Sequence, residues 1–170
     1  MGKIFQLLED REKRVEKLRC LKQKYNAPCI FVRANYPGIE KTNEVTIGIV
    51  SEIIKELEKI FEKEIIYMEK GISLEGPYGI FIVNGEAKNI KLKTLKIEEN
   101  HFLGRLVDID IYGLKGNESI SRSIFGKSKR KCYICSDDAH NCVRSQKHSL
   151  EEIENFIKEK WINFCEENNE

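Results

Sequence analysis

Two aspartates placed two residues apart are the first feature of the sequence that suggests chemistry. Asp108 and Asp110 lie in the run 106–112, in which apolar and polar residues alternate. Residues i and i+2 of a strand share a face, so both carboxylates project together, about 6–7 Å apart, and repel unless water or a cation lies between them. Phosphoryl and nucleotidyl transfer use such carboxylates, together with substrate phosphates, to bind Mg²⁺. The alternative is the solvated face of an ordinary amphipathic strand.

Positive charge flanks these aspartates, although the whole chain has 29 basic and 28 acidic residues and a net charge of only +1. Residues 88–147 contain thirteen Lys and Arg against seven Asp and Glu, whereas the chain from residue 151 onward contains seven acidic residues and two lysines. The net charge excludes a general field that would attract nucleic acid or membranes, so a polyanion must meet a local cluster. Candidates for clamping a polyphosphate, with a solvated loop as the alternative, are Arg105, Arg122, Lys129, Arg130, Lys131 and Arg144.

Three cysteines and a histidine form a further candidate site. Cys132 and Cys135 have the Cys-x₂-Cys spacing of zinc ligands, and Cys142 and His148 would complete a Cys₃His site. Such a site beside the basic loop 127–131 would support a second function, a zinc-supported nucleic-acid-binding module. The other interpretation, which we prefer on the sequence alone, is that small thiols pack this loop against the last helix.

Length and composition limit the fold that must position these residues. A chain of 170 residues with 41% hydrophobic residues and three prolines fits one globular domain over residues 1–170, and excludes collagen-like and disordered classes. The sequence has no signal peptide and no apolar run of the roughly 20 residues that a membrane helix needs. We therefore expect a cytoplasmic protein with reduced cysteines.

Apolar periodicity predicts helices alternating with strands. Helical spacing covers residues 5–25 and 45–61, and a last helix begins at Ser149, where Glu152 completes a capping box. The segment 86–100 is ambiguous, and we assign it as a helix. Strands are expected over residues 27–34, 64–69, 79–83 and 106–112, the last with Val107, Ile109 and Ile111 toward the core. The fold class is therefore α/β, or α+β, with one mixed sheet and flanking helices.

Several motifs occur in the order found in one enzyme family. The central block runs Leu-Gly-Arg-Leu-Val-Asp-Ile-Asp-Ile over residues 103–111, and is followed by Ile120-Ser121-Arg122, Arg130-Lys131-Cys132-x₂-Cys135 and the segment 139–149. Upstream landmarks are Arg11-Glu12-Lys13-Arg14, Asn35-x-Pro37-Gly38-x₂-Lys41, Gly76-Pro77-x-Gly79-Ile80-Phe81 and Glu98-Glu99-x-His101. Over nearly its whole length the chain resembles the holo-citrate lyase synthase family, also called apo-citrate lyase phosphoribosyl-dephospho-CoA transferase. It departs from the family pattern at Ile39, where a proline is usual, and at Gln146, where an arginine is usual.

The resemblance implies an activity and its partners. The family transfers the prosthetic group of 2′-(5″-triphosphoribosyl)-3′-dephospho-CoA to a serine of the acyl carrier protein (gamma) subunit of citrate lyase, and pyrophosphate leaves. A separate and weaker resemblance, to nucleotidyltransferases in general, suggests a similar mixed sheet, although their usual Gly-Ser pair before the aspartates is replaced here by Leu103-Gly104-Arg105. A membrane or nucleic acid has no part in this reaction.

The resemblance also suggests residue roles. Asp108 and Asp110 would bind Mg²⁺, and either Glu98 or His101 would take the serine proton. On the residues alone, His101 is better explained as a histidine at the edge of the core. The residues expected to bind the donor and the departing pyrophosphate are Arg11, Arg14, Lys41, Arg105, Arg122, Arg130, Lys131 and Arg144.

Overall fold

The structure, a computed structural model, describes residues 2–168, in which five α-helices and four strands form. In chain order they are α1 (Lys3–Tyr25), β1 (Cys29–Ala34), α2 (Glu44–Ile60), β2 (Ile65–Ser73), β3 (Gly76–Val83), α3 (Ala87–Asn100), β4 (Val107–Tyr112), α4 (Ala139–Ser145) and α5 (Leu150–Glu167). Short 3-10 turns occupy Gly104–Leu106 and Arg122–Phe125.

The four strands form one sheet in the order β2-β3-β1-β4. Strands β1 and β2, which α2 connects, are separated by β3, and strands β3 and β4, which α3 connects, are separated by β1. These two interleaved split βαβ units are the ferredoxin-like arrangement. All three strand pairings are antiparallel, so the expected mixed sheet is corrected to an antiparallel one, and the α+β form of the expected class applies.

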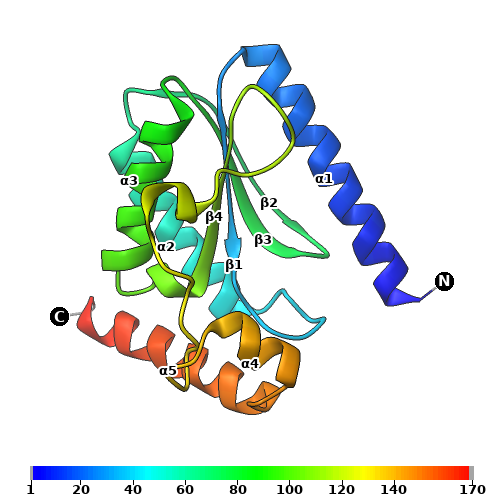
Figure 1. Cartoon of the computed structure of the whole chain (residues 1–170), viewed down its shortest axis with the longest axis vertical. Coiled ribbons are helices and arrows are strands. Elements are labelled where there is room, and N and C mark those ends of the chain that lie inside the picture. Colours follow the sequence, from blue (N-terminus) through cyan, green and yellow to red (C-terminus); the bar gives the residue numbers. More distant parts are fainter. Residues whose placement is uncertain (1, 169–170) are drawn as a thin grey trace.

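Helices cover both faces of the sheet, but unequally (Figure 1). Helices α2 and α3 pack on one face, where Ile30, Val32 and Ile109 join the larger core. Val107 and Ile111 are buried in that core too, as their alternation predicts. Helix α1 lies against the other face, where a smaller cluster contains Leu18, Phe31 and Ile80 among others.

Helix α1 leaves part of its face of the sheet open. Its N-terminal end extends away from the sheet in Figure 1, and its apolar residues Phe5, Leu8 and Val15 are exposed. Asp108 and Asp110 point to this less covered face, because they alternate with the core residues of β4. The two predicted metal ligands therefore lie on the face of the sheet that α1 covers only in part.

Charged side chains from outside the sheet bind the free edge of β4. Lys91 Nζ donates to the carbonyl of Ile109 over 2.8 Å, and the amide of Ile109 donates to Glu98 Oε1 over 3.2 Å. Arg130 Nη1 donates to the carbonyl of Val107 over 3.0 Å. Unpaired strand edges invite pairing with other chains, and these contacts occupy the edge. They also explain why Lys91 and Glu98 are buried despite their charge.

The helix at the C-terminal end is fixed by its cap and by one close contact. The predicted capping box is confirmed: Ser149 and Glu152 exchange hydrogen bonds at the start of α5. Trp161 packs on α2 at Gly48, where an added Cβ would lie 2.3 Å from the indole ring. A larger residue at position 48 would therefore push α5 away from the core.

The remaining sequence predictions fit the structure with small changes. The ambiguous segment 86–100 is helical, and the short strand expected over 64–69 extends to Ser73. Helix α4 was not predicted, since seven residues give too little periodicity to recognise. Among the described residues, no helix combines the length and the apolar character needed to cross a bilayer.

Candidate active site

A buried glutamate binds three arginines on the open face of the sheet. Glu75 lies in the turn between β2 and β3, and its carboxylate accepts hydrogen bonds from Arg33 Nη1 over 2.8 Å and from Arg11 Nε over 3.3 Å. Arg14 Nε lies 3.0 Å from the second oxygen of Glu75. One negative charge therefore holds three positive charges from α1 and β1 in one place, which leaves an excess of cation.

Asp108 and Lys41 extend this cluster around a cavity of about 130 Å³. Asp108 stands opposite Arg33 in the β1–β4 register, and Arg33 Nη2 lies 4.0 Å from its Oδ2. Burial, followed by the charge of Arg33, lowers the pKa of Lys41 below its ordinary value. The carboxylates of Asp108 and Glu75 act against this lowering but do not cancel it, so a bound anion would stabilise the charged form of Lys41.

Asp110 is the more enclosed of the two aspartates on this face. Burial raises its pKa above the ordinary value, and the neighbouring charge of Asp108 raises it further. A carboxylate in this situation is stabilised by a cation placed next to it. The pair thus offers two carboxylates on one face of β4, the ligand type that suits a hard divalent ion.

Arg130 connects Asp108 to Glu98. Its Nη1 donates to Asp108 Oδ1 over 2.8 Å, and its Nη2 donates to Glu98 Oε1 over 2.5 Å. The same oxygen of Glu98 accepts the amide of Ile109. In this structure the buried Glu98 holds Arg130 and the edge of β4, and its role as a proton acceptor stays a prediction.

His101 lies on the opposite side of the sheet from Asp108. Its Nδ1 accepts a hydrogen bond from the amide of Leu103 over 3.1 Å, and its ring centroid is 5.8 Å from that of Phe164. Burial lowers its pKa, and the carboxylates that act against this effect, those of Glu56 and Glu52, belong to α2. This position matches the histidine at the edge of the core that the residues alone favoured.

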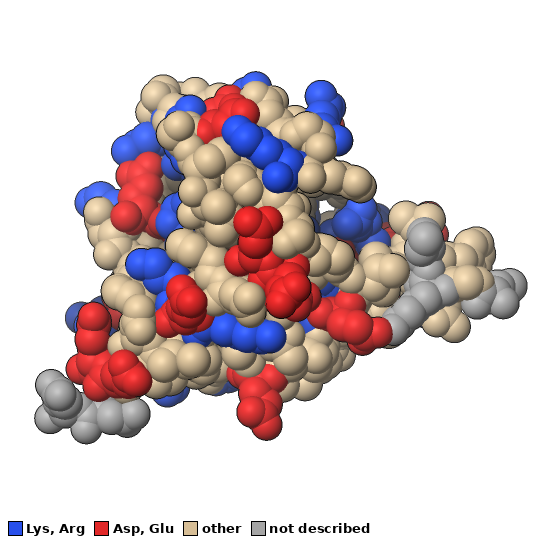
Figure 2. All heavy atoms as spheres, turned by 90° about the horizontal axis from the view of Figure 1, so that it is seen from below, with Lys and Arg blue, Asp and Glu red and all other residues tan. Residues whose placement is uncertain are grey.

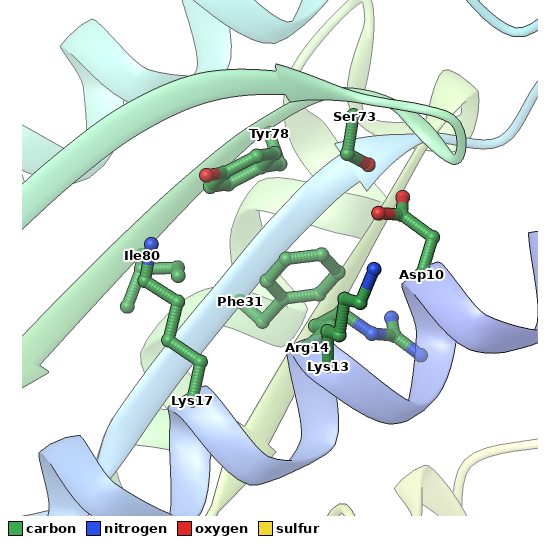
Figure 3. A pocket seen from close by; sticks show the side chains of 8 residues that line it. All are labelled: Asp10, Lys13, Arg14, Lys17, Phe31, Ser73, Tyr78 and Ile80. Atoms are coloured by element: carbon green, nitrogen blue, oxygen red, sulfur yellow. The ribbon is translucent and has the colours of Figure 1, made fainter.

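A second cavity, of about 120 Å³, lies between α1 and the sheet and has aromatic walls (Figure 3). Its walls include Phe31 and Tyr78, and the guanidinium carbon of Arg14 is 4.7 Å from the Phe31 ring centroid. Lys17 Nζ lies 5.9 Å from the Tyr78 ring centroid and pairs with Glu69. Because Arg14 also pairs with Glu75, this groove borders the cationic cluster.

The other predicted substrate-binding residues lie apart from that cluster. Arg105 lies over the Tyr133 ring at 5.5 Å, donates to the carbonyl of Lys131, and lines a third cavity, of about 140 Å³, which Arg130 also reaches. The Lys131 ammonium is 2.8 Å from Asp138. Arg122 Nη2 lies 3.2 Å from Glu99, and Arg144 is exposed on α4.

Two members of the cluster were missed by the sequence analysis. Arg33 follows four buried residues of a central strand, and an arginine in that position is a signal that could have been used. Glu75 directly precedes the recognised Gly76-Pro77 motif, but nothing local shows that its side chain is buried. The pairing of β1 with β3 brings these two residues together, and local sequence does not show that pairing.

The four predicted zinc ligands lie together in the structure. One ligand atom from each of Cys132, Cys135, Cys142 and His148 lies within 4.8 Å of every other. They join the loop after Arg130 to α4 and to the start of α5.

The cationic cluster, the paired carboxylates and the ring-walled groove offer the kinds of groups with which enzymes that transfer a group from a phosphorylated donor bind their substrate. Comparison with known proteins agrees with this class. Residues 3–164 match the family described as apo-citrate lyase phosphoribosyl-dephospho-CoA transferase, and the chain belongs to that family. It is therefore a transferase.

Its relatives include proteins of several bacteria. A protein of Streptococcus pyogenes serotype M3, named a probable apo-citrate lyase phosphoribosyl-dephospho-CoA transferase, is 30% identical over 168 residues, which cover 96% of this chain and 88% of the relative. The apo-citrate lyase phosphoribosyl-dephospho-CoA transferase of Escherichia coli O7:K1 is 29% identical over 158 residues, which cover 91% of this chain and 86% of that relative. Protein CitXG of Leuconostoc mesenteroides is 31% identical over 94% of this chain, but the match spans only 36% of CitXG.

The alternative nucleic-acid function gains no support from the surface. In the basic loop, Lys127 lies 2.9 Å from Glu99, and Arg130 and Lys131 pair with Asp108 and Asp138. Figure 2 shows the face seen from below, the side on which α5 lies, where acidic side chains in the middle are interspersed with lysine and arginine and form no continuous basic surface. A loop in which three of the four cations are paired with carboxylates is poorly suited to a nucleic-acid backbone.

Proposed function

We propose that this protein transfers the phosphoribosyl-dephospho-CoA group of 2′-(5″-triphosphoribosyl)-3′-dephospho-CoA to a serine of the acyl carrier protein subunit of citrate lyase, in the cytoplasm. The serine oxygen bonds to the α-phosphorus of the triphosphate and loses its proton. The bond from that phosphorus to the bridging oxygen breaks, and pyrophosphate leaves. The product is a phosphodiester between carrier and prosthetic group.

The observation that carries this proposal is the excess of cation around Glu75 in a chain of this family. Arg11, Arg33 and Lys41 line the same cavity as Asp108. In our proposal they bind the triphosphate and stabilise the negative charge of the departing pyrophosphate. The arginines contribute bidentate hydrogen bonds and fix the orientation of the phosphates, while the ammonium of Lys41 contributes a compact charge.

The neighbouring groove gives the rest of the donor a place to lie. The partly exposed Tyr78 ring stacks on the buried Phe31 ring and provides a flat wall, and Arg14, which lies over Phe31, borders both the groove and the cluster. We assign the adenine of the donor to this groove, because an aromatic wall stacks a purine and the adjacent guanidiniums receive its phosphates.

We also propose that Asp108 and Asp110 hold Mg²⁺ when the donor is bound. When bound, this ion would neutralise charge on the triphosphate oxygens. The fit rests on two carboxylates on one face of β4 and on the raised pKa of Asp110. Arg130 keeps Asp108 in place through one oxygen, Oδ1. The second oxygen of Asp108 makes only the 4.0 Å approach to Arg33.

Mass spectrometry of the apo carrier protein tests the activity. The carrier is incubated with this protein, Mg²⁺ and the triphosphorylated donor, and we expect its mass to increase by that of the donor less pyrophosphate. A carrier whose acceptor serine is replaced by alanine is the control and should keep its mass. An unchanged mass of the intact carrier, with the donor present in excess, would contradict the proposal.

A further inference from the structure

We infer that Cys132, Cys135, Cys142 and His148 form a structural zinc site. The preference for packing thiols, which the sequence alone suggested, does not explain their arrangement. The Cys135 and Cys142 sulfurs are 3.5 Å apart, and His148 Nε2 lies 3.3 Å from the Cys135 sulfur. In a tetrahedral site with Zn–S of about 2.3 Å and Zn–N of about 2.0 Å, neighbouring ligand atoms are separated by roughly 3.5–3.8 Å. These two distances are close to the spacing that one zinc ion imposes, and all four ligand atoms lie within 4.8 Å of one another.

Other roles for these residues fit less well. The 3.5 Å between the Cys135 and Cys142 sulfurs is far longer than a disulfide bond of about 2.05 Å, and all six cysteines are free thiols. Thiols that only fill space are normally buried, yet Cys132 and Cys135 are half-exposed. Filling space also gives no reason for a histidine nitrogen to face a sulfur. Three thiolates and one imidazole in tetrahedral arrangement select zinc among the common metals.

The backbone around the cysteines supports ligation. The isolated bridge between Lys131 and Asp138 closes the loop that contains Cys132 and Cys135. Within that loop the amide of Ile134 points at the Cys132 sulfur, at 3.4 Å. An amide directed at a sulfur stabilises the thiolate form that a metal requires.

The segment that carries the four residues has few buried apolar side chains to hold its shape. Between Ile111 and Ile157, Cys142 is the only buried apolar residue among the described residues. Between Gly113 and Ser149, the regular structure described is limited to the seven residues of α4, one 3-10 turn and isolated β-bridges at Ser119 and between Lys131 and Asp138. Metal ligation provides folding free energy where burial provides little. We therefore assign the zinc to fixing the loop on the body of the protein.

The zinc loop also carries a residue of the candidate active site. Arg130 stands two residues before Cys132 and binds both Asp108 and Glu98. Tyr133 donates to the carbonyl of Arg105 over 2.9 Å and stacks on Phe156 at 5.3 Å. Loss of the metal should thus release Arg130 from Asp108. This last consequence rests on the proposed function, whereas the zinc site itself does not.

Elemental analysis of the purified full-length chain tests the site directly. We expect about one zinc per chain, lost in Cys135→Ser and in His148→Ala. Three matched controls should retain it: Cys165→Ser and His140→Ala, which alter a cysteine and a histidine outside the cluster, and Asp108→Asn, which alters the proposed Mg²⁺ site. Zinc that disappears in Asp108→Asn and persists in Cys135→Ser would overturn the assignment.

Cobalt substitution covers the case in which the cysteine variants fail to fold. The unsubstituted chain, stripped of metal and reloaded with Co²⁺, should show the intense visible absorption of tetrahedral thiolate ligation, with one equivalent of Zn²⁺ abolishing it. A chain that holds no zinc as purified and gives no such absorption with Co²⁺ has no zinc site. Neither measurement depends on transfer activity, so failure of the proposed function would leave this result intact.

Discussion

Arg33 on β1 and Asp108 on β4 stand directly opposite each other in the antiparallel register, yet the guanidinium of Arg33 bonds more closely to Glu75. It donates to Glu75 over 2.8 Å and lies 4.0 Å from Asp108. Arg33 therefore stands between the carboxylate that gathers the arginines and the carboxylate that we assign to Mg²⁺. This position makes it the most informative residue of the candidate site.

Arg33→Ala is expected to weaken pyrophosphate binding by roughly ten- to a hundredfold, because charge-assisted hydrogen bonds contribute about 1.5–3 kcal/mol each. Arg33→Lys should give an intermediate loss of pyrophosphate affinity, since lysine keeps the positive charge but cannot make the bidentate hydrogen bonds of a guanidinium. Titration calorimetry with pyrophosphate measures both. Arg19→Ala is the control, because Arg19 pairs with Glu16 on the exposed side of α1. Equal affinities in Arg33→Ala and Arg19→Ala would remove Arg33 from the site.

Asp110→Asn should abolish transfer and raise thermal stability at neutral pH. Folding raises the pKa of Asp110. At pH values between its pKa in the unfolded chain and its raised pKa in the folded protein, the native state therefore binds more protons than the unfolded state. Stability contributed by this group therefore falls as pH rises through that window, and the full penalty is present above it. Asparagine has no charge and avoids the penalty. Melting temperatures of both proteins across the acidic range measure this, and a variant less stable at pH 7 would contradict it.

Asp108→Asn should also abolish transfer but should lower stability. Its carboxylate is 2.8 Å from Arg130, and about one third of the Asp108 side chain is exposed, so solvent weakens the pair. We expect a loss of about 1 kcal/mol in the free energy of unfolding. Chemical denaturation measures the stability, and the carrier mass assay at saturating Mg²⁺ measures transfer. A variant that transfers at the normal rate would show that Asp108 is not a metal ligand.

Glu75→Gln should destabilise the fold by roughly 2–3 kcal/mol, because three arginines lose the one buried carboxylate that compensates them and their own partial exposure reduces the cost. Pyrophosphate should restore part of the loss, since it supplies the missing negative charge. Urea denaturation with and without pyrophosphate measures both effects. Glu58→Gln, which changes an exposed pair with Lys70, should have little effect. If the two variants are equally stable, Glu75 does not organise the cluster.

Pyrophosphate binding should weaken as pH rises through the lowered pKa of Lys41. The charged form of Lys41 is disfavoured in the folded protein, so between its lowered pKa and 10.5 the unfolded state binds more protons and stability rises with pH. Bound pyrophosphate would favour the charged form of Lys41, so binding would be accompanied by uptake of a proton. Calorimetry in two buffers of different ionisation enthalpy detects that uptake, and Lys41→Met should remove it. Uptake that persists in Lys41→Met belongs to another group.

The sequence by itself determined the local elements of the site. Period-two alternation placed Asp108 and Asp110 on one face of a strand, and the capping box at Ser149 fixed the start of the last helix. Both are properties of neighbouring residues and need no knowledge of the rest of the fold. The spacing of Cys132 and Cys135 offered zinc ligation as one of two interpretations, and on the sequence alone thiol packing was preferred. The family resemblance correctly identified the family.

Tertiary structure alone decided which charged residues meet. Glu75 and Arg33 are 42 residues apart, and only the β1–β3 pairing and the docking of α1 bring Arg11 and Arg14 to the same carboxylate. Glu98 and His101 are neighbours in sequence, but the end of α3 directs one to β4 and the other toward α5. Strand order and helix docking depend on how the apolar faces of distant elements fit together. Local spacing carries no record of that fit, so the cluster around Glu75 became visible only in the folded chain.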